Sequence, residues 1–143
     1  LNPDFLKGWI HLAATELKLG LFDEVTALMQ KARGMWPDSP MVQDYLGLAA
    51  ANASRTTEAI AFFSEALQLD RPYLPGWYNR ATAHRKLGKL DAALADLEEA
   101  VKLAPNSPQL LGAKADILEA MGFIEKAREV RRQAAACSPI PGL

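Results

Sequence analysis

The residue types that most often carry catalysis or bind metals are sparse in this chain. His11 and His84 are 73 residues apart, and neither has a carboxylate or a cysteine at the spacing of a metal site or a catalytic triad. The single cysteine, Cys137, excludes an internal disulfide and a cysteine-rich zinc site. We therefore predict a protein that is not an enzyme and that holds no metal or cofactor. We expect His84 to serve packing, His11 to contact solvent or a ligand, and Cys137 to be structural or incidental rather than a reactive thiol.

Two other stretches could suggest a site for phosphate or nucleic acid. The segment "LGKLDAAL" (87–94) lacks the G-x-x-x-x-G-K-[ST] pattern of a phosphate-binding loop, and we interpret it as a helix–turn–helix connection. The segment "KAREVRR" (126–132) is basic, but the chain as a whole has a formal net charge of −1. We interpret it as a solvated cap, and nucleic acid is not an expected partner. Direct insertion into a membrane is not expected, because no apolar run approaches ~20 residues.

The three tryptophans could form an aromatic ligand box. Trp9 and Trp77 are 68 residues apart, twice an interval of 34 residues that recurs along the chain. Equivalent places in a repeated unit favour a role in the core, so both rings are expected to be buried. Trp36 has no counterpart at this interval, and it is expected either to pack beneath the following turn or to form an exposed contact.

The interval of 34 residues organises the whole chain. Where a small residue keeps one phase through every unit, two helix backbones must approach closely, because a larger side chain would overpack the contact at a cost of ~1–3 kcal/mol. Four gapless units follow, at 6–39, 40–73, 74–107 and 108–141. The series that define them are Ala32, Ala66, Ala100 and Ala134; Ala13, Gly47, Ala81 and Ala115; Val25, Ala59, Ala93 and Ala127; and Gly20, Ser54, Gly88 and Gly122.

Each unit contains two helical patterns, separated by Gly or Ser near its middle and closed by proline near its end. Ser39-Pro40 and Ser107-Pro108 each place a good N-cap residue before a proline, which is tolerated at the first helical position. The sequence therefore predicts an all-α fold, with helices at 6–19, 23–36, 40–53, 57–70, 74–87, 91–104, 108–121 and 125–137.

The period and the paired helices resemble the tetratricopeptide repeat (TPR). The family pattern W-x2-L-G-x2-Y, followed by Ala, Phe and Pro, is approximated by "WIHLAATE" and "WYNRATAH" in the first and third units. Its later part is approximated by "EVTALMQKARGMWP", "EAIAFFSEALQLDRP", "AALADLEEAVKLAP" and "KAREVRRQAAACSP". The resemblance extends from residue 6 to about residue 139. It implies an α-solenoid, a right-handed superhelix of TPR units.

The chain also departs from the family pattern. The tyrosine that usually closes the first-helix motif is replaced by Glu16, Ala50, His84 and Leu118. Gln43 stands in the second unit where the first and third units have tryptophan. The linker "DRPYLPGW" (70–77) is rich in proline, and we expect a different angle between the second and third units.

The two ends of the array differ. Residues 1–4, "LNPD", are in register with "LAPN" at 103–106, so residues 1–5 are interpreted as the tail of a preceding repeat and the chain as part of a longer array or protein. In the fourth unit Arg131 takes the place of the bulky Met29, Phe63 and Leu97, as expected of a terminal, cap-like repeat. At the first unit we expect exposed apolar surface and end-to-end self-association.

In the TPR family the first helix of each unit supplies most of the inner, concave face. The resemblance therefore implies a peptide-binding surface at one phase of these helices: Lys7, Ile10, His11, Lys18, Met41, Asp44, Tyr45, Leu48, Asn52, Tyr78, Asn79, Thr82, Arg85 and Lys86.

Each type of side chain on this surface suggests its own contact with a peptide. Tyrosines offer stiff contact area, Asn79 can pair with a ligand backbone, and Lys18, Arg85 and Lys86 can meet acidic residues. In the fourth unit Asp116 and Glu119 are acidic, so one orientation of the peptide is expected to be preferred.

The sequence thus predicts a protein–protein interaction scaffold that binds an extended or short helical peptide with acidic residues. The carboxylate clamp of some TPR proteins is disfavoured, because in the better frame only one of its five positions, Asn79, is matched. Two alternatives remain open. The chain could be a docking segment of a larger enzyme or of a secretion or assembly protein, or a scaffold that assembles with itself. The compartment is not fixed by the sequence, although the cytoplasm is favoured.

Overall fold

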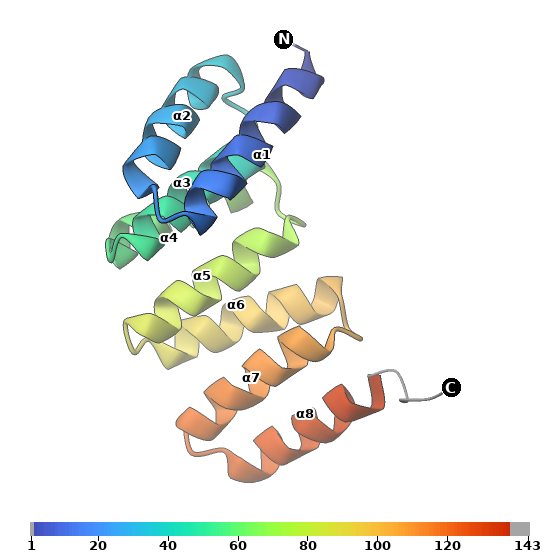
Figure 1. Ribbon diagram of the computed structural model, residues 1–143. Coiled ribbons are helices and arrows are strands. Elements are labelled where there is room, and N and C mark those ends of the chain that lie inside the picture. The colour runs from blue at the N-terminus through green and yellow to red at the C-terminus, as the bar shows by residue number, and fades with distance from the viewer. Residues whose placement is uncertain (1, 138–143) are drawn as a thin grey trace.

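The computed structural model describes residues 2–137, which form eight α-helices and no strand. The helices are paired, and the pairs stack in chain order from the amino to the carboxyl end (Figure 1). The expectation of an all-α solenoid is confirmed. The helices are α1 (Pro3–Lys18), α2 (Phe22–Met35), α3 (Pro40–Asn52), α4 (Thr56–Leu69), α5 (Leu74–Lys86), α6 (Leu90–Leu103), α7 (Pro108–Ala120) and α8 (Ile124–Cys137).

Most helix boundaries lie within one residue of those expected from the sequence, and α1 is the exception. It begins at Pro3 because the Asn2 side chain accepts a hydrogen bond of 2.9 Å from the Asp4 backbone N–H, and proline follows at the first helical position. Residues 3–5 therefore continue α1 rather than forming a loop. Leu1 and residues 138–143, which include the end of the fourth unit, lie outside the described residues, and the derivation of residues 1–5 from a preceding repeat stays a prediction.

The turn inside each unit requires a left-handed backbone conformation. Gly20, Gly88 and Gly122 have φ angles of +78°, +75° and +89°, a region that glycine enters without steric cost. Ser54 holds the same place in the second unit with φ of +65° and is the one non-glycine residue of the described range with positive φ. The glycine–serine series of the sequence therefore marks four equivalent turns.

Small residues mark the seams between helices, as predicted. Ala32, Ala66 and Ala100 are fully buried, and the bulky Met29 and Leu97 are buried beside them in the cores of their units. The apolar core is thus divided into several clusters along the stack, and the larger clusters join residues of neighbouring units.

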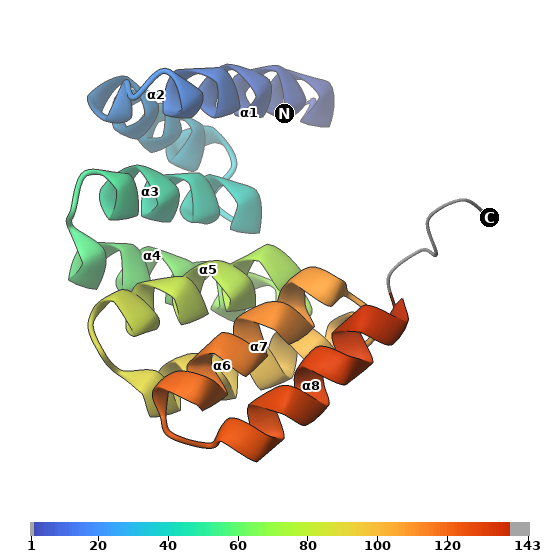
Figure 2. The same ribbon diagram turned by 60° about the horizontal axis from the view of Figure 1, so that its bottom comes forward.

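The first helices face the inner side of the stack. Between units α2 packs on α3, α4 on α5 and α6 on α7, and in addition α1 contacts α3 and α3 contacts α5. No comparable contact joins α2 to α4 or α4 to α6 within residues 2–137. In the first three units the first helices therefore lie closer together than the second helices do, which gives this part of the stack an inner and an outer side. Figure 2 shows the same stack with α7 and α8 turned towards the viewer.

Candidate functional site

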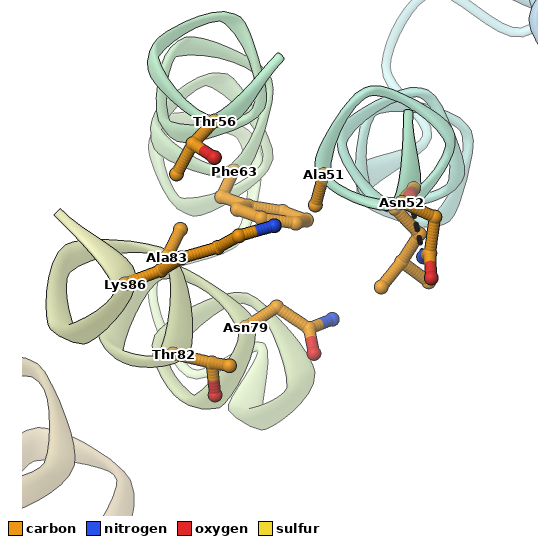
Figure 3. A pocket seen from close by; sticks show the side chains of 9 residues that line it. Ala51, Asn52, Thr56, Phe63, Asn79, Thr82, Ala83 and Lys86 are labelled. Atoms are coloured by element: carbon orange, nitrogen blue, oxygen red, sulfur yellow. Dashed lines mark hydrogen bonds between the residues drawn. The ribbon is translucent and has the colours of Figure 1, made fainter. Parts of the chain in front are cut away.

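A pocket of about 230 Å³ opens among α3, α4 and α5. Its floor is apolar, formed by side chains such as Phe63 and Ala83, and its rim carries polar groups from α3 and α5, the first helices of the second and third units (Figure 3). The structure brings together here five residues that the sequence placed on the concave face. The lining residues are Leu48, Ala51, Asn52, Thr56, Phe63, Asn79, Thr82, Ala83 and Lys86.

Two polar side chains of the rim are held by their own helices. The Asn52 amide donates to the Leu48 carbonyl oxygen at 2.8 Å, and the Thr82 hydroxyl donates to the Tyr78 carbonyl oxygen at 3.0 Å. These bonds to the preceding turn fix each side chain against its helix and leave the pocket open.

Three of the four lysine and arginine side chains of the predicted surface have no acidic partner in the part of the chain that the structure describes. None of the three, Lys18, Arg85 and Lys86, takes part in an ion pair within residues 2–137. All three are exposed, and Lys86 extends from α5 into the pocket (Figure 3). Lys7, by contrast, lies 3.8 Å from Asp4 in an exposed pair.

Asp44 lies inside the protein and not on the concave surface, which corrects the sequence expectation. Its side chain accepts hydrogen bonds from the Asn79 amide at 2.8 Å and from the Tyr73 hydroxyl at 3.2 Å. Burial raises the pKa of Asp44 to about 6, although both hydrogen bonds act in the opposite direction. Asp44 therefore connects α3 to the third unit. The Asn79 side-chain amide donates one N–H to Asp44, and no hydrogen bond among residues 2–137 occupies the side-chain oxygen of Asn79.

Ile10 is the second residue whose expected exposure is corrected. It is buried in the first core cluster with Val25, Met29 and Val42. Ile10 lies on the side of α1 that faces the second unit, and that unit covers its side chain.

The two predicted tyrosine anchors are half-buried. Tyr45 packs against the first core cluster, and Tyr78 packs against the cluster of the third unit. The Tyr78 hydroxyl accepts a long hydrogen bond of 3.5 Å from the Gln109 amide on α7. Beside it lies a smaller hollow of about 90 Å³, which Thr82 and Arg85 also line. Three other residues of the predicted surface, His11, Met41 and Lys18, are exposed on their helices.

The acidic end of the predicted surface is neutralised within the protein. Arg131 on α8 lies 2.8 Å from Asp116 and 2.6 Å from Glu119, both on α7. In the other units the residue equivalent to Arg131 is apolar and buried. Here it turns to the carboxylates of its own unit, so the expected charge division along the groove is weaker than the sequence suggested.

A charged network that the sequence did not predict joins the second and third units. Arg80 on α5 donates to both carboxylate oxygens of Asp96 at 2.8 and 2.7 Å and to the Ser64 hydroxyl on α4 at 3.1 Å. His84 lies 3.8 Å from Asp96, and burial lowers the pKa of this histidine. The arrangement is a structural link, in agreement with the packing role expected for His84.

The remaining candidates for chemistry lie apart from one another. Trp36 is partly buried and packs edge-on against Trp9, with ring centroids 5.8 Å apart. Cys137 is half-buried at the end of α8. Within residues 2–137 no group of three or more histidine, cysteine or acidic side chains could hold a metal ion. No helix of this range is long and apolar enough to cross a membrane.

Family models of the tetratricopeptide repeat match residues 6–73 and residues 75–107 of the chain. The chain belongs to the tetratricopeptide repeat family. The family matches end at residue 107, so the fourth unit expected from the sequence, at 108–141, lies beyond them. The fold and the family together show a protein-interaction scaffold, and nothing in the described residues shows a catalytic site.

Several similar proteins are longer than this chain, and their solved structures share its fold. FlbA of Caulobacter vibrioides is 33% identical over 127 residues, which are 86% of this chain and 21% of FlbA. A thermophilic TPR protein of Thermus thermophilus superposes with a TM-score of 0.85 at 23% identity, covering 98% of this chain and 77% of that one. Cut9 of Schizosaccharomyces pombe, solved in complex with Hcn1, superposes with a TM-score of 0.82 at 25% identity, covering 92% of this chain and 26% of Cut9. The chain thus spans about a fifth of FlbA.

Proposed function

We propose that this TPR array binds a peptide segment of a partner protein in the pocket among α3, α4 and α5, and that the segment places an acidic residue beside an apolar one. The observation that carries the proposal is the combination of an apolar floor at Phe63 with an unpaired cation, Lys86, in the same pocket.

The size of the pocket favours a side chain over a whole small molecule. At about 230 Å³ it lies below the ~300–1,000 Å³ of sites that enclose drug-sized ligands. Leu48 and Ala51, which are partly exposed, supply apolar contact for one side chain of a peptide, while the rest of that peptide lies along the first helices. This size also argues against a substrate pocket.

Charge favours an acidic neighbour to that apolar side chain. Arg85 and Lys86 end α5 without an internal carboxylate among the described residues, so a ligand carboxylate would pair with them without breaking an existing ion pair. Charge-assisted hydrogen bonds are about twice as strong as neutral ones. The side-chain oxygen of Asn79, which has no partner within residues 2–137, can accept a backbone N–H of the peptide.

Selection from a random peptide library tests this function, because it does not require the partner to be identified first. The wild-type chain should enrich peptides with an acidic residue next to a leucine-like residue, and Lys86→Glu should lose them. Lys31→Glu is the matched control, because Lys31 is an exposed lysine on α2, outside the pocket. Enrichment of peptides without acidic residues, or equal enrichment by Lys86→Glu, would refute the assignment of the pocket.

A second function, assembly through α1, has an observation of its own. Phe5, Leu12 and Leu19 follow one another at intervals of seven residues along α1 and its C-cap, and all three are exposed. Leu46, the equivalent of Leu12 in the second unit, is buried against the preceding unit. The face of α1 that points away from the second unit is therefore suited to be covered by another repeat, in a longer protein or in a second copy of this chain.

A further inference from the structure

The carboxyl group of Asp44 lies next to the peptide pocket, separated from it by one side chain. Asp44 is 3% exposed. The Asn79 amide donates to its Oδ1 atom at 2.8 Å, and the Tyr73 hydroxyl donates to its Oδ2 atom at 3.2 Å. Asn79 is also a lining residue of the pocket (Figure 3). A change at the buried carboxyl group can therefore reach the pocket through Asn79.

The side-chain oxygen of Asn79 is open to a ligand. The side chain is partly exposed, and no hydrogen bond among residues 2–137 occupies its oxygen. In this range the polar side-chain atoms that are both buried and without a partner belong to other residues, namely Glu16, Trp36, Gln43 and His84. The Asn79 oxygen is thus an accessible acceptor at the edge of the pocket.

The ionisation of Asp44 decides which end of the Asn79 amide faces it. An ionised carboxylate can only accept hydrogen bonds, so the amide turns its N–H towards Asp44 and leaves its oxygen free. In Figure 3 the amide nitrogen of Asn79 accordingly lies on the side of α3. A protonated carboxyl group has an O–H that can donate to the amide oxygen instead. Because the two ends of an amide are alike in size, the group can then turn over and present its N–H to the pocket.

We propose that Asp44 is a positioning residue that makes the pocket select a peptide by its backbone N–H, an inference that rests on the function proposed for this pocket. With Asp44 ionised, the free oxygen of Asn79 accepts that N–H. With Asp44 protonated, its O–H donates to the Asn79 oxygen, and the N–H of the turned amide meets the N–H of the same peptide. The Tyr73 hydroxyl donates to the other carboxyl oxygen in both states.

The change between the two states falls near neutral pH. Burial raises the pKa of Asp44 to about 6, while the hydrogen bonds from Asn79 and Tyr73 act in the opposite direction. Burial, and after it the charge of Asp44, raises the pKa of Tyr73 and of Tyr45, so both hydroxyls keep their protons. Asp70 acts on Tyr73, and no basic side chain of residues 2–137 is among the groups that act on Asp44. The affinity for the peptide should therefore rise with pH through this range.

The binding test uses a peptide that the full wild-type chain enriches from a random library at neutral pH. Its affinity should fall about three- to tenfold from pH 7.5 to pH 5, the loss expected for one hydrogen bond. Asp44→Asn cannot ionise and should show little of this change. Asp23→Asn, at an exposed residue of α2, is the matched control and should keep the full change. Carboxylates of the peptide titrate near pH 4 and affect all chains equally.

Replacement of the peptide N–H groups by ester oxygens, one at a time, identifies the bond to Asn79. At one position the ester should weaken binding to the wild type about three- to tenfold at pH 7.5 and less than about twofold at pH 5. In Asp44→Asn the effect of this ester should be the same at both pH values. An ester scan of the wild type that does not depend on pH at any position would overturn the proposal.

A measurement without peptide separates this inference from the proposed function and does not need Asp44→Asn to fold. In NMR spectra of the wild type, nuclear Overhauser contacts between the Asn79 amide protons and the Asp44 β-protons should be present at pH 7.5 and lost at pH 5. Contacts that persist at pH 5 overturn the inference, as does the same pH dependence of affinity in the wild type and Asp44→Asn. Equal binding of the peptide by Lys86→Glu would instead refute the proposed function, since the orientation of Asn79 is measured without a ligand.

Discussion

The ring of Phe63 on α4 lies so close to Gly47 on α3 that a β-carbon on this glycine would overlap it. In the first and third units the equivalent pairs are Ala13 with Met29 and Ala81 with Leu97, which share their core clusters. The second unit therefore combines the largest side chain with no side chain, and the other two combine an intermediate side chain with alanine. A larger side chain on the second helix is thus matched by a smaller one on the first helix of the same unit.

Gly47→Ala should destabilise the protein because the new methyl group meets a ring that is fully buried. Overpacking costs ~1–3 kcal/mol, which exceeds the ~1 kcal/mol that alanine gains over glycine within a helix. Phe63→Leu should reduce the cost, since the double variant copies Ala81 with Leu97. In a double-mutant cycle by chemical denaturation we expect a coupling of about 1 kcal/mol or more. Additive effects of the two changes would show that the contact does not set the helix separation.

Ser54→Gly should stabilise the protein by about 0.5–1 kcal/mol. A residue with a β-carbon is strained at φ of +65°, and this strain outweighs the greater entropy of glycine in the unfolded chain. Gly88→Ser, at the equivalent turn, should destabilise by a similar amount. Thermal unfolding should give a higher melting temperature for Ser54→Gly than for the wild type and a lower one for Gly88→Ser. A melting temperature of Ser54→Gly below that of the wild type would contradict the interpretation.

The stability should depend on pH through Asp44. Its pKa is raised to about 6 in the folded protein, so between about pH 4 and 6 the folded state binds more protons at this site than the unfolded state does. The contribution of Asp44 to stability therefore falls as pH rises through this range, by about 2–3 kcal/mol. The difference in unfolding free energy between the wild type and Asp44→Asn isolates this group from the other carboxylates. If that difference were constant across this range and up to neutral pH, the carboxyl would not be held as described.

Two copies of the chain should associate at high protein concentration through the face of α1 that points away from the second unit. Leu12 is 48% exposed, whereas its equivalent Leu46 is 1% exposed under the preceding unit. Leu12→Glu should shift the chain towards the monomer in sedimentation velocity, because a charge would have to be buried in the contact. Leu103→Glu, at an exposed leucine on α6, is the matched control. A wild-type chain that stays monomeric at millimolar concentration would show that this face has no affinity for itself.

Features that depend on the repeat itself can be predicted from the sequence. The turns at Gly88 and its equivalents, the buried alanines and nearly all helix ends follow from local geometry that is the same in every unit. Contacts specific to one pair of units cannot be predicted in this way. The helical phase of Asp44 indicates an inward, solvent-facing side chain, yet Tyr73, just before α5, and Asn79 on α5 cover it.

The same limit applies to Arg131 and Gln43. The sequence indicates an outward polar residue at Arg131, but its pairing with Asp116 and Glu119 depends on the angle between α7 and α8. The replacement of tryptophan by Gln43 is visible in the sequence. The pocket beside Gln43 has walls from α2 and α4, and the sequence does not show that these two helices approach each other there.

The affinity of Arg85→Glu/Lys86→Glu for a peptide selected by the wild-type chain tests the central claim most directly. Isothermal titration should show a loss of at least about 2–3 kcal/mol, because like charges would then face each other in the groove. Lys31→Glu/Lys102→Glu makes the same change in net charge on two second helices and should bind as the wild type does. Circular dichroism should show all variants folded, since exposed substitutions usually change stability by less than ~0.5 kcal/mol. Unchanged affinity in a folded Arg85→Glu/Lys86→Glu variant would contradict the account, because the partner would then bind elsewhere than in this groove.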